Sequence, residues 1–167
     1  MLLQNLRARM SARLSGDREA GFTLIELLVV MLILGILAAI AIPAFFNQRD
    51  KGTDAQAKAA VRTAQTAIET FATDHAGSYS GATPAELQNI EETLVINEGA
   101  EDNDNAITVG KKVVAGALVE APDDSEYAVA AKSGTGTLFM ISRAGGAVDF
   151  DCAPVGGGCP TGGNWNE

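Results

Sequence analysis

The sequence predicts an α+β protein in which a long N-terminal helix packs its second half on a small antiparallel β-sheet. An uncharged apolar run of twenty residues, from Leu27 to Phe46, predicts the first half of that helix. Apolar residues at helical spacing predict the second half over residues 47–76. After residue 106, short β-like segments alternate with turns that contain Gly, Asp or Ser, which is typical of an antiparallel sheet.

The apolar run is long enough to cross a membrane. At about 1.5 Å per residue, a helix of this length spans roughly 30 Å, which is the thickness of the hydrocarbon core of a bilayer. No second run of this kind follows in the sequence. We therefore expect one membrane-spanning segment, residues 22–46, followed by a part outside the bilayer.

Charge is distributed unequally on the two sides of this run. The formal net charge is -9, and the leader, residues 1–21, carries +2, so that the remaining residues carry -11. Basic residues before an apolar run place the N-terminus in the cytoplasm, and the acidic remainder then lies across the membrane. An acidic surface predicts no nucleic-acid partner, because phosphate binding requires an excess of Lys and Arg.

The apolar run differs from a secretory signal peptide. It is longer than the 7–15 residues typical of such a signal, and the segment after it, NQRDKGTDAQ, lacks a convincing small-residue cleavage site. A small-residue junction precedes the run instead, at residues 20–22. We expect the run to be retained in the mature protein.

The helix is expected to run from about residue 23 to 75, on the order of 80 Å. Pro43 removes a backbone donor near the end of the apolar run, which predicts a bend there or a simple end of the span. Gly77 is the predicted C-terminal stop. The apolar positions that carry the helical spacing are Ala57, Ala60, Val61, Ala64, Ile68 and Phe71.

A second helix is predicted over residues 83–95, because Thr83 and Glu86 fit a capping box and Pro84 suits the first helical position. An acidic loop, residues 97–106, follows it. The predicted strands cover residues 107–109, 112–119, 126–132, 137–142 and 146–150.

Glu26 stands out because it lies at the edge of the apolar run, where a charge is costly. Thr23 and Glu26 themselves fit a capping box, and an acidic residue in the first turn suits the helix dipole. Alternatively, Glu26 pairs with a positive charge supplied by a neighbouring chain. Taken apart from its flanking residues, the capping interpretation is favoured.

Cys152 and Cys159 are the two cysteines of the chain, and six residues separate them. A disulfide is favoured over free thiols, because a translocated domain lies where disulfides persist and the Gly-rich segment between the cysteines is flexible. Two thiols and one histidine do not complete a zinc site.

We expect no metal site and no cofactor. The acidic loop contains Asp102 and Asp104 but lacks the glycine and the final glutamate of a calcium loop. His75 lies near the end of the long helix and has no partner for nucleophilic catalysis, so a surface or capping role is expected. We predict that the chain is not an enzyme. The other acidic residues considered for calcium are Glu98, Glu101, Asp123, Asp124, Asp149 and Asp151.

The segment GFTLIELLVVMLILGILAAIAIPAF resembles the N-terminal segment of type IV pilins and of the pseudopilins of type II secretion. The resemblance implies cleavage by a prepilin peptidase between Gly21 and Phe22 and methylation of the new amine on Phe22. It also implies that Glu26 acts in filament assembly, that Pro43 bends the helix, and that a C-terminal disulfide loop is present. With these flanking residues, the assembly role of Glu26 is favoured over capping alone.

The resemblance therefore implies a prepilin, a structural subunit of a type IV pilus-like filament. The alternatives are a pseudopilin of a secretion system and a competence or adhesive minor pilin. The implied partners are prepilin peptidase, other pilin copies, the inner membrane before assembly and a membrane assembly platform; the implied locations are the cytoplasmic membrane and then an extracellular or periplasmic filament. The expected parts are the leader 1–21, the membrane-spanning half 22–46, the amphipathic half 47–76 and a globular head 77–167.

Overall fold

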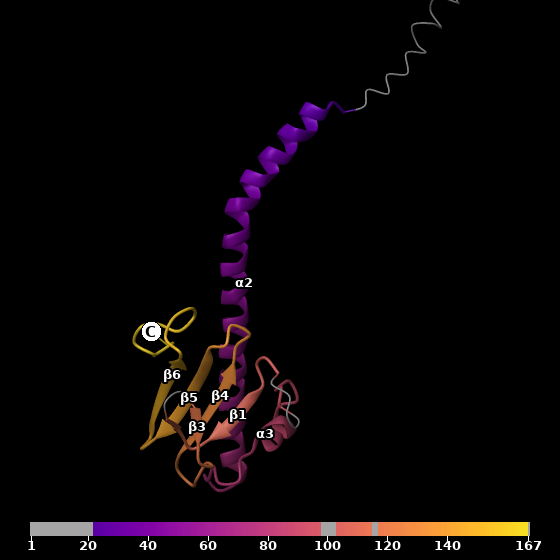
Figure 1. Cartoon of the computed structure of the whole chain (residues 1–167). Helices are drawn as coiled ribbons and strands as arrows, with labels where there is room; N and C mark the ends of the chain where they lie inside the picture. Colours follow the sequence, from indigo (N-terminus) through magenta and orange to yellow (C-terminus); the bar gives the residue numbers. More distant parts are fainter. Residues whose placement is uncertain (1–21, 98–102, 115–116, 167) are drawn as a thin grey trace, which may run out of the picture. The chain divides into compact units, whose positions relative to one another are not determined.

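The computed structural model describes residues 22–97, 103–114 and 117–166 (Figure 1). Contacts divide the chain into two units, residues 1–43 and residues 44–167. We call the second of these the C-terminal unit. The helix α2, Leu24–Asp74, contributes residues to both units.

Helix α2 has 51 residues, and the predicted long helix is confirmed. It continues through Pro43, while a bend at Pro43 stays a prediction. At its C-terminal end the backbone turns away at Ala76 and Gly77, which both have positive φ, and the Gly77 amide donates to the carbonyl of Ala72 at 2.7 Å. A left-handed conformation costs glycine little, which explains why the helix ends just before Gly77.

Helix α3, Pro84–Ile90, begins as predicted and ends earlier than predicted. Thr83 Oγ1 accepts a hydrogen bond from the Glu86 amide at 3.2 Å, and Pro84 occupies the first turn. The predicted extension to residue 95 is wrong, because residues 94–96 serve other partners. The carbonyl of Val95 accepts from the Ile107 amide at 2.8 Å, and residue 96 forms a parallel bridge with residue 107.

The main sheet has four antiparallel strands in the order β1-β4-β5-β6. The predicted strand positions are confirmed for all four, with ends that differ by a few residues. In the central pair, Tyr127 lies opposite Arg143 and Lys132 opposite Leu138. The strands are β1 Ile107–Gly110, β4 Tyr127–Lys132, β5 Leu138–Ala144 and β6 Ala147–Ala153.

The single strand predicted over residues 112–119 is wrong. Two short strands, β2 Lys112–Val114 and β3 Ala117–Val119, pair with each other in an antiparallel hairpin. Two residues, Ala115 and Gly116, separate them. A two-residue connection that contains glycine is a hairpin signal, so the sequence carried the information that the strand prediction overlooked.

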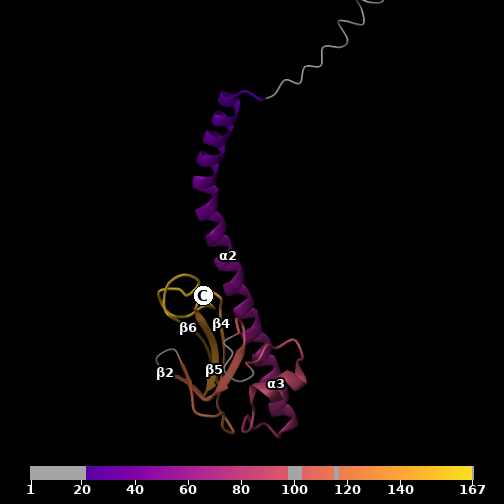
Figure 2. The same cartoon turned by 45° about the vertical axis from the view of Figure 1, so that its right-hand side comes forward.

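The core of the C-terminal unit lies between the second half of α2 and one face of the sheet (Figures 1 and 2). The predicted apolar face of α2 is confirmed as buried, apart from Ala60, which is half-buried. Strand β4 is buried on its other face too, at Ala128 and Ala130, and β2 and β3 contact β4. The core side chains of α2 are Ala57, Val61, Ala64, Ala67, Ile68, Phe71 and Ala72.

Candidate functional site

The first part of α2 exposes apolar side chains on all sides. Phe22 is 88% exposed, and the large apolar side chains that follow, up to Ile42, are exposed as well. Among the described residues, α2 is the helix that is long and apolar enough to cross a membrane. Burying this surface stabilises the chain at about 25 cal/mol per Å², so the segment requires lipid or protein around it.

Glu26 caps the start of its own helix. Its Oε2 accepts hydrogen bonds from the backbone amide and from Oγ1 of Thr23, both at 2.8 Å, while the Glu26 amide donates to Thr23 Oγ1 at 3.2 Å. The capping box that the sequence suggested is therefore formed in the single chain. The assembly role of Glu26 stays a prediction, because it requires a neighbouring chain.

The surface beside Glu26 forms an open groove of about 420 Å³. Phe22, Ile25, Val29 and Val30 line it together with Glu26, and the carboxylate is its charged group. The residues of the predicted cleavage and methylation site are thus next to one another at the start of α2, except that Gly21 lies outside the described residues.

The predicted disulfide between Cys152 and Cys159 is confirmed. The two sulfur atoms are 2.06 Å apart, and the Cα atoms are separated by 5.6 Å. Gly156 and Cys159 exchange backbone hydrogen bonds at 2.9 and 3.0 Å, which closes the small loop between the cysteines. Both cysteines are buried, so the disulfide belongs to the core of the C-terminal unit.

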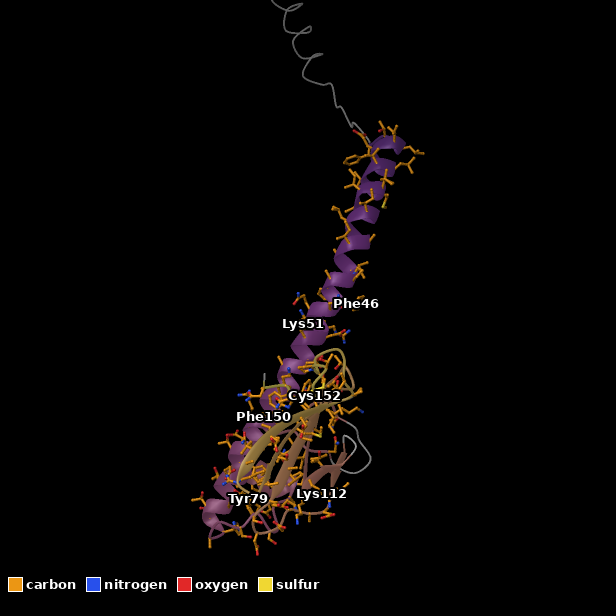
Figure 3. The ribbon with its side chains drawn as sticks, turned by 90° about the vertical axis from the view of Figure 1, so that its left-hand side faces the viewer. Phe46, Lys51, Tyr79, Lys112, Phe150 and Cys152 are labelled. Atoms are coloured by element: carbon orange, nitrogen blue, oxygen red, sulfur yellow. A yellow bond between two sulfur atoms is a disulfide. The ribbon has the colours of Figure 1, made fainter. Side chains whose placement is uncertain are left out.

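The residues after Cys159 return to the sheet and cover the edge of β6. The Trp165 ring nitrogen donates to the carbonyl of Met140 at 3.0 Å, and the Cys152 amide donates to the carbonyl of Gly163 at 2.7 Å. Figure 3 labels Phe150 and Cys152 on this strand. The Phe150 and Trp165 rings meet edge to face, with centroids 5.2 Å apart. A covered edge does not offer its backbone to other strands.

Polar residues of α2 hold this C-terminal segment, and the sequence analysis missed their roles. Arg62 donates to Asn166 Oδ1 at 3.1 Å, and Lys58 Nζ lies 3.3 Å from the carbonyl oxygen of Gly158. Lys58 Nζ also lies 4.8 Å from the centroid of the Phe139 ring. The helical spacing of these residues marks a polar face, but it carries no sign of partners about 100 residues away.

Asp54 is 4% exposed, which is unusual for a carboxylate. Its Oδ1 accepts hydrogen bonds from Ser133 Oγ and Thr135 Oγ1, each at 2.6 Å. On its other side the carboxylate contacts Gly158 so closely that a Cβ atom at residue 158 would overlap it. Asp54 therefore joins α2 to the turn between β4 and β5 and to the disulfide loop.

Glu69 joins α2 to two strands. It accepts hydrogen bonds from Tyr127 Oη at 2.8 Å, from Tyr79 Oη at 2.9 Å and from Arg143 at 2.9 Å. Burial raises the pKa of Glu69, but the hydrogen bonds from Tyr127, Tyr79 and Arg143 lower it further, so that its pKa lies below the ordinary value. Burial and the Glu69 carboxylate raise the pKa of Tyr127.

The acidic residues considered for calcium are dispersed. Within residues 22–97, 103–114 and 117–166, no group of three or more His, Cys, Asp or Glu side chains could hold a metal ion. Asp123 pairs with Lys111 at 2.6 Å, and Asp124 accepts from Ser78 Oγ at 2.6 Å. His75 Nδ1 lies 2.8 Å from the carbonyl oxygen of Phe71, at the end of α2. Glu98, Glu101 and Asp102 lie outside the described residues.

Comparison with known proteins agrees with this architecture. The family described as the prokaryotic N-terminal methylation motif matches residues 16–42. The chain is 46% identical over 54 residues to the type IV major pilin protein PilA of Myxococcus xanthus, which covers 32% of this chain and 24% of that protein. No solved structure matches the chain.

Two further relatives are covered over more of their length. The chain is 41% identical over 80 residues to the type IV narrow pilus major component PilA5 of Thermus thermophilus, covering 40% of this chain and 69% of that protein. It is 34% identical over 113 residues to the type IV major fimbrial protein FimA of Dichelobacter nodosus, covering 68% of this chain and 65% of that protein. Proteins named type II secretion system core protein G and competence protein ComGC also match.

The long helix, the antiparallel sheet and the methylation motif together define a type IV pilin-like protein. The chain belongs to the type IV pilin family. Members of this family are structural proteins, which confirms the prediction that the chain is not an enzyme. The apolar helix and the family are consistent with anchoring in a membrane and with a pilus.

Proposed function

We propose that the chain is a prepilin that is cut between Gly21 and Phe22, methylated on Phe22 and assembled into a type IV pilus-like filament. The methylation motif spans this junction, since it matches residues 16–42. Relatives that share the motif are named as major components of type IV pili. The leader 1–21 is removed in this scheme, and the apolar half of α2 is retained.

The observation that carries the proposal is the exposure of the apolar side chains over residues 22–46 in a single chain. Such a surface is stable in lipid before assembly, and against the helices of neighbouring subunits after assembly. The first condition assigns the mature chain to the cytoplasmic membrane. The arginines of the leader favour a cytoplasmic N-terminus, with the C-terminal unit outside the cytoplasm.

Glu26 acts in two stages in this proposal. In the precursor it caps α2 through Thr23, as described above. Cleavage creates a positively charged amine on Phe22, and Glu26 of one subunit pairs with that amine in a neighbour. A charge near the centre of a bilayer costs roughly 2.5–3.5 kcal/mol and less near the interface, so pairing favours the stagger that brings the two groups together.

The remaining predicted parts have corresponding roles. Residues 22–46 form the filament core, residues 47–76 carry the head, and residues 77–167 complete it. A bend at Pro43 adjusts the packing of neighbouring helices. The partners are prepilin peptidase, further pilin copies and a membrane assembly platform.

The test replaces Glu26 with Gln and measures incorporation into filaments sheared from the cell surface. We expect unchanged membrane insertion and leader removal, because Gln retains the polar contact with Thr23. We expect incorporation to fall about tenfold or more, because the charge that recognises the Phe22 amine is lost. Normal filament yield would refute the pairing, and intact leader in the wild-type chain would refute the processing step.

A pseudopilin role is the second candidate, since a protein named type II secretion system core protein G matches this chain. Deletion of the chain separates the two functions. Loss of surface fibres supports the pilus, whereas loss of protein secretion with fibres retained supports the pseudopilin. A competence or adhesive minor pilin would instead leave fibres in place and remove DNA uptake or attachment.

A further inference from the structure

A long groove runs beside α2 within the C-terminal unit. One stretch has a volume of about 310 Å³ and lies between α2 and residues 93–95, and the next has a volume of about 440 Å³ and lies between α2 and residues 90–91. Thr63 lines both stretches, so they form one groove. Figures 1 and 2 show α3 and the segment that follows it on the other side of α2 from β6.

The groove is lined with uncharged side chains. On its outer wall, Ile90 is 39% exposed and Val95 is 43% exposed, which is unusual for large apolar residues of a head. Glu91 is its charged lining residue, and its carboxylate is bound by the amide and hydroxyl of Thr93 at 3.3 and 2.7 Å. The lining residues of α2 are Gln56, Ala59, Ala60, Thr63, Thr66, Ala67 and Thr70.

The charges of the same part of α2 lie on its other faces. Lys58 and Arg62 contact the C-terminal segment, Asp54 is buried beneath the disulfide loop, and Glu69 binds Tyr79 and Arg143. The groove face therefore remains uncharged over about four helical turns.

One polar atom in the groove lacks a partner. Oδ1 of Asn105 is buried and accepts no hydrogen bond from the described residues. Asn105 lines the first stretch of the groove, between Thr93 and α2. A buried carbonyl oxygen without a donor is costly, so a donor supplied from outside the chain would stabilise this position.

We infer that this groove, residues 56–70 of α2 with residues 90–95 and Asn105, is the surface on which a second copy of this chain docks its own uncharged surface. Charge decides the occupant: two copies with a net charge of -9 each repel, and they approach at least cost where neither presents a charge. The docked copy covers Ile90 and Val95 and supplies a donor to Asn105. The inference rests on the proposed filament and assigns a contact to its heads.

The test compares two substitutions one helical turn apart. Ala59 and Ala55 are both exposed on α2, but Ala59 lines the groove and Ala55 does not. Ala59→Arg places a charge in the proposed contact, and Ala55→Arg is the matched control. Leader removal and circular dichroism of the detergent-solubilised full chain show that both variants fold and are processed.

We expect Ala59→Arg to lower incorporation into sheared filaments about tenfold or more, and Ala55→Arg to leave it within about twofold. Equal incorporation of the two variants, or equal loss in both, would overturn the groove assignment while wild-type filaments still support the proposed function. A photocrosslinking residue at position 63 provides a second readout in wild-type cells. Crosslinked products that contain two copies of this chain support the inference, and products with lipid or another protein alone refute it.

Discussion

Glu69 is the residue whose charge state the fold controls most directly. Its carboxylate accepts hydrogen bonds from Tyr79, Tyr127 and Arg143, and these partners come from three different segments. Because these donors hold its pKa below the ordinary value of 4.5, the folded state binds the proton less readily than the unfolded state. The resulting stability is present above the unfolded pKa and is lost as the pH falls through the folded pKa.

Glu69→Gln is expected to lower the free energy of unfolding by about 1–2 kcal/mol at pH 7, a range that allows for solvent screening of the half-exposed carboxylate. The difference between the variant and the wild type should shrink at pH 3, where the wild-type carboxylate is protonated as well. Urea unfolding of the detergent-solubilised chain at both pH values measures this. Glu92→Gln, at an exposed position, is the control, and a difference that is independent of pH would contradict the assignment.

Gly158 shows how a single missing side chain permits a buried carboxylate. A Cβ atom at this position would overlap the carboxylate of Asp54, which is held by Ser133 and Thr135. Because Asp54 cannot move without losing these hydrogen bonds, overpacking here is costly.

Gly158→Ala should therefore destabilise the C-terminal unit by about 1–3 kcal/mol in thermal unfolding. Gly162→Ala is the matched control, since nothing lies within 4 Å of a Cβ atom built there, and it should change stability by no more than about 0.5 kcal/mol. Equal effects of the two substitutions would show that the contact with Asp54 is not the cause.

At the scale of elements, α2 does two jobs with one continuous helix. Its first part exposes apolar side chains, and its second part buries one face against the sheet. The C-terminal segment adds to that contact, because Trp165 and the disulfide loop lie over β6 and bind Lys58 and Arg62. The sheet thus has one edge covered by residues 163–165 and the other bridged by residue 96.

At the scale of the whole molecule, the core belongs to the C-terminal unit alone. Every side chain of the core cluster lies at or after Ala57. Phe45 and Phe46 are exposed and contribute nothing to that cluster. The apolar segment before them is needed for the membrane and the proposed filament rather than for folding of the sheet.

A chain that begins at Gln48 should therefore fold as a soluble monomer. We expect a cooperative thermal transition, a circular dichroism spectrum with both helix and strand, and a monomeric mass in light scattering without detergent. The full chain should require detergent under the same conditions. Absence of a cooperative transition in the shortened chain would contradict the view that residues 57–165 hold the complete core.

Local patterns in the sequence were enough to predict the long helix, its apolar first half, the family motif, the disulfide and the positions of the main strands. These patterns are the absence of charge over residues 27–46, the helical spacing after it, and the turn residues between short apolar segments. The capping box of Glu26 is local as well, since Thr23 is three residues away.

Tertiary packing, by contrast, sets where α3 ends, that β2 and β3 cover β4, and what the polar face of α2 binds. The partners of Asp54, Lys58 and Glu69 lie far away in the sequence, and the periodicity of a helix carries no information about them. The groove beside α2 has the same origin, because residues 90–95 reach it through the contact between residue 95 and β1. Local patterns select helices and strands, whereas packing over long sequence separations selects their neighbours.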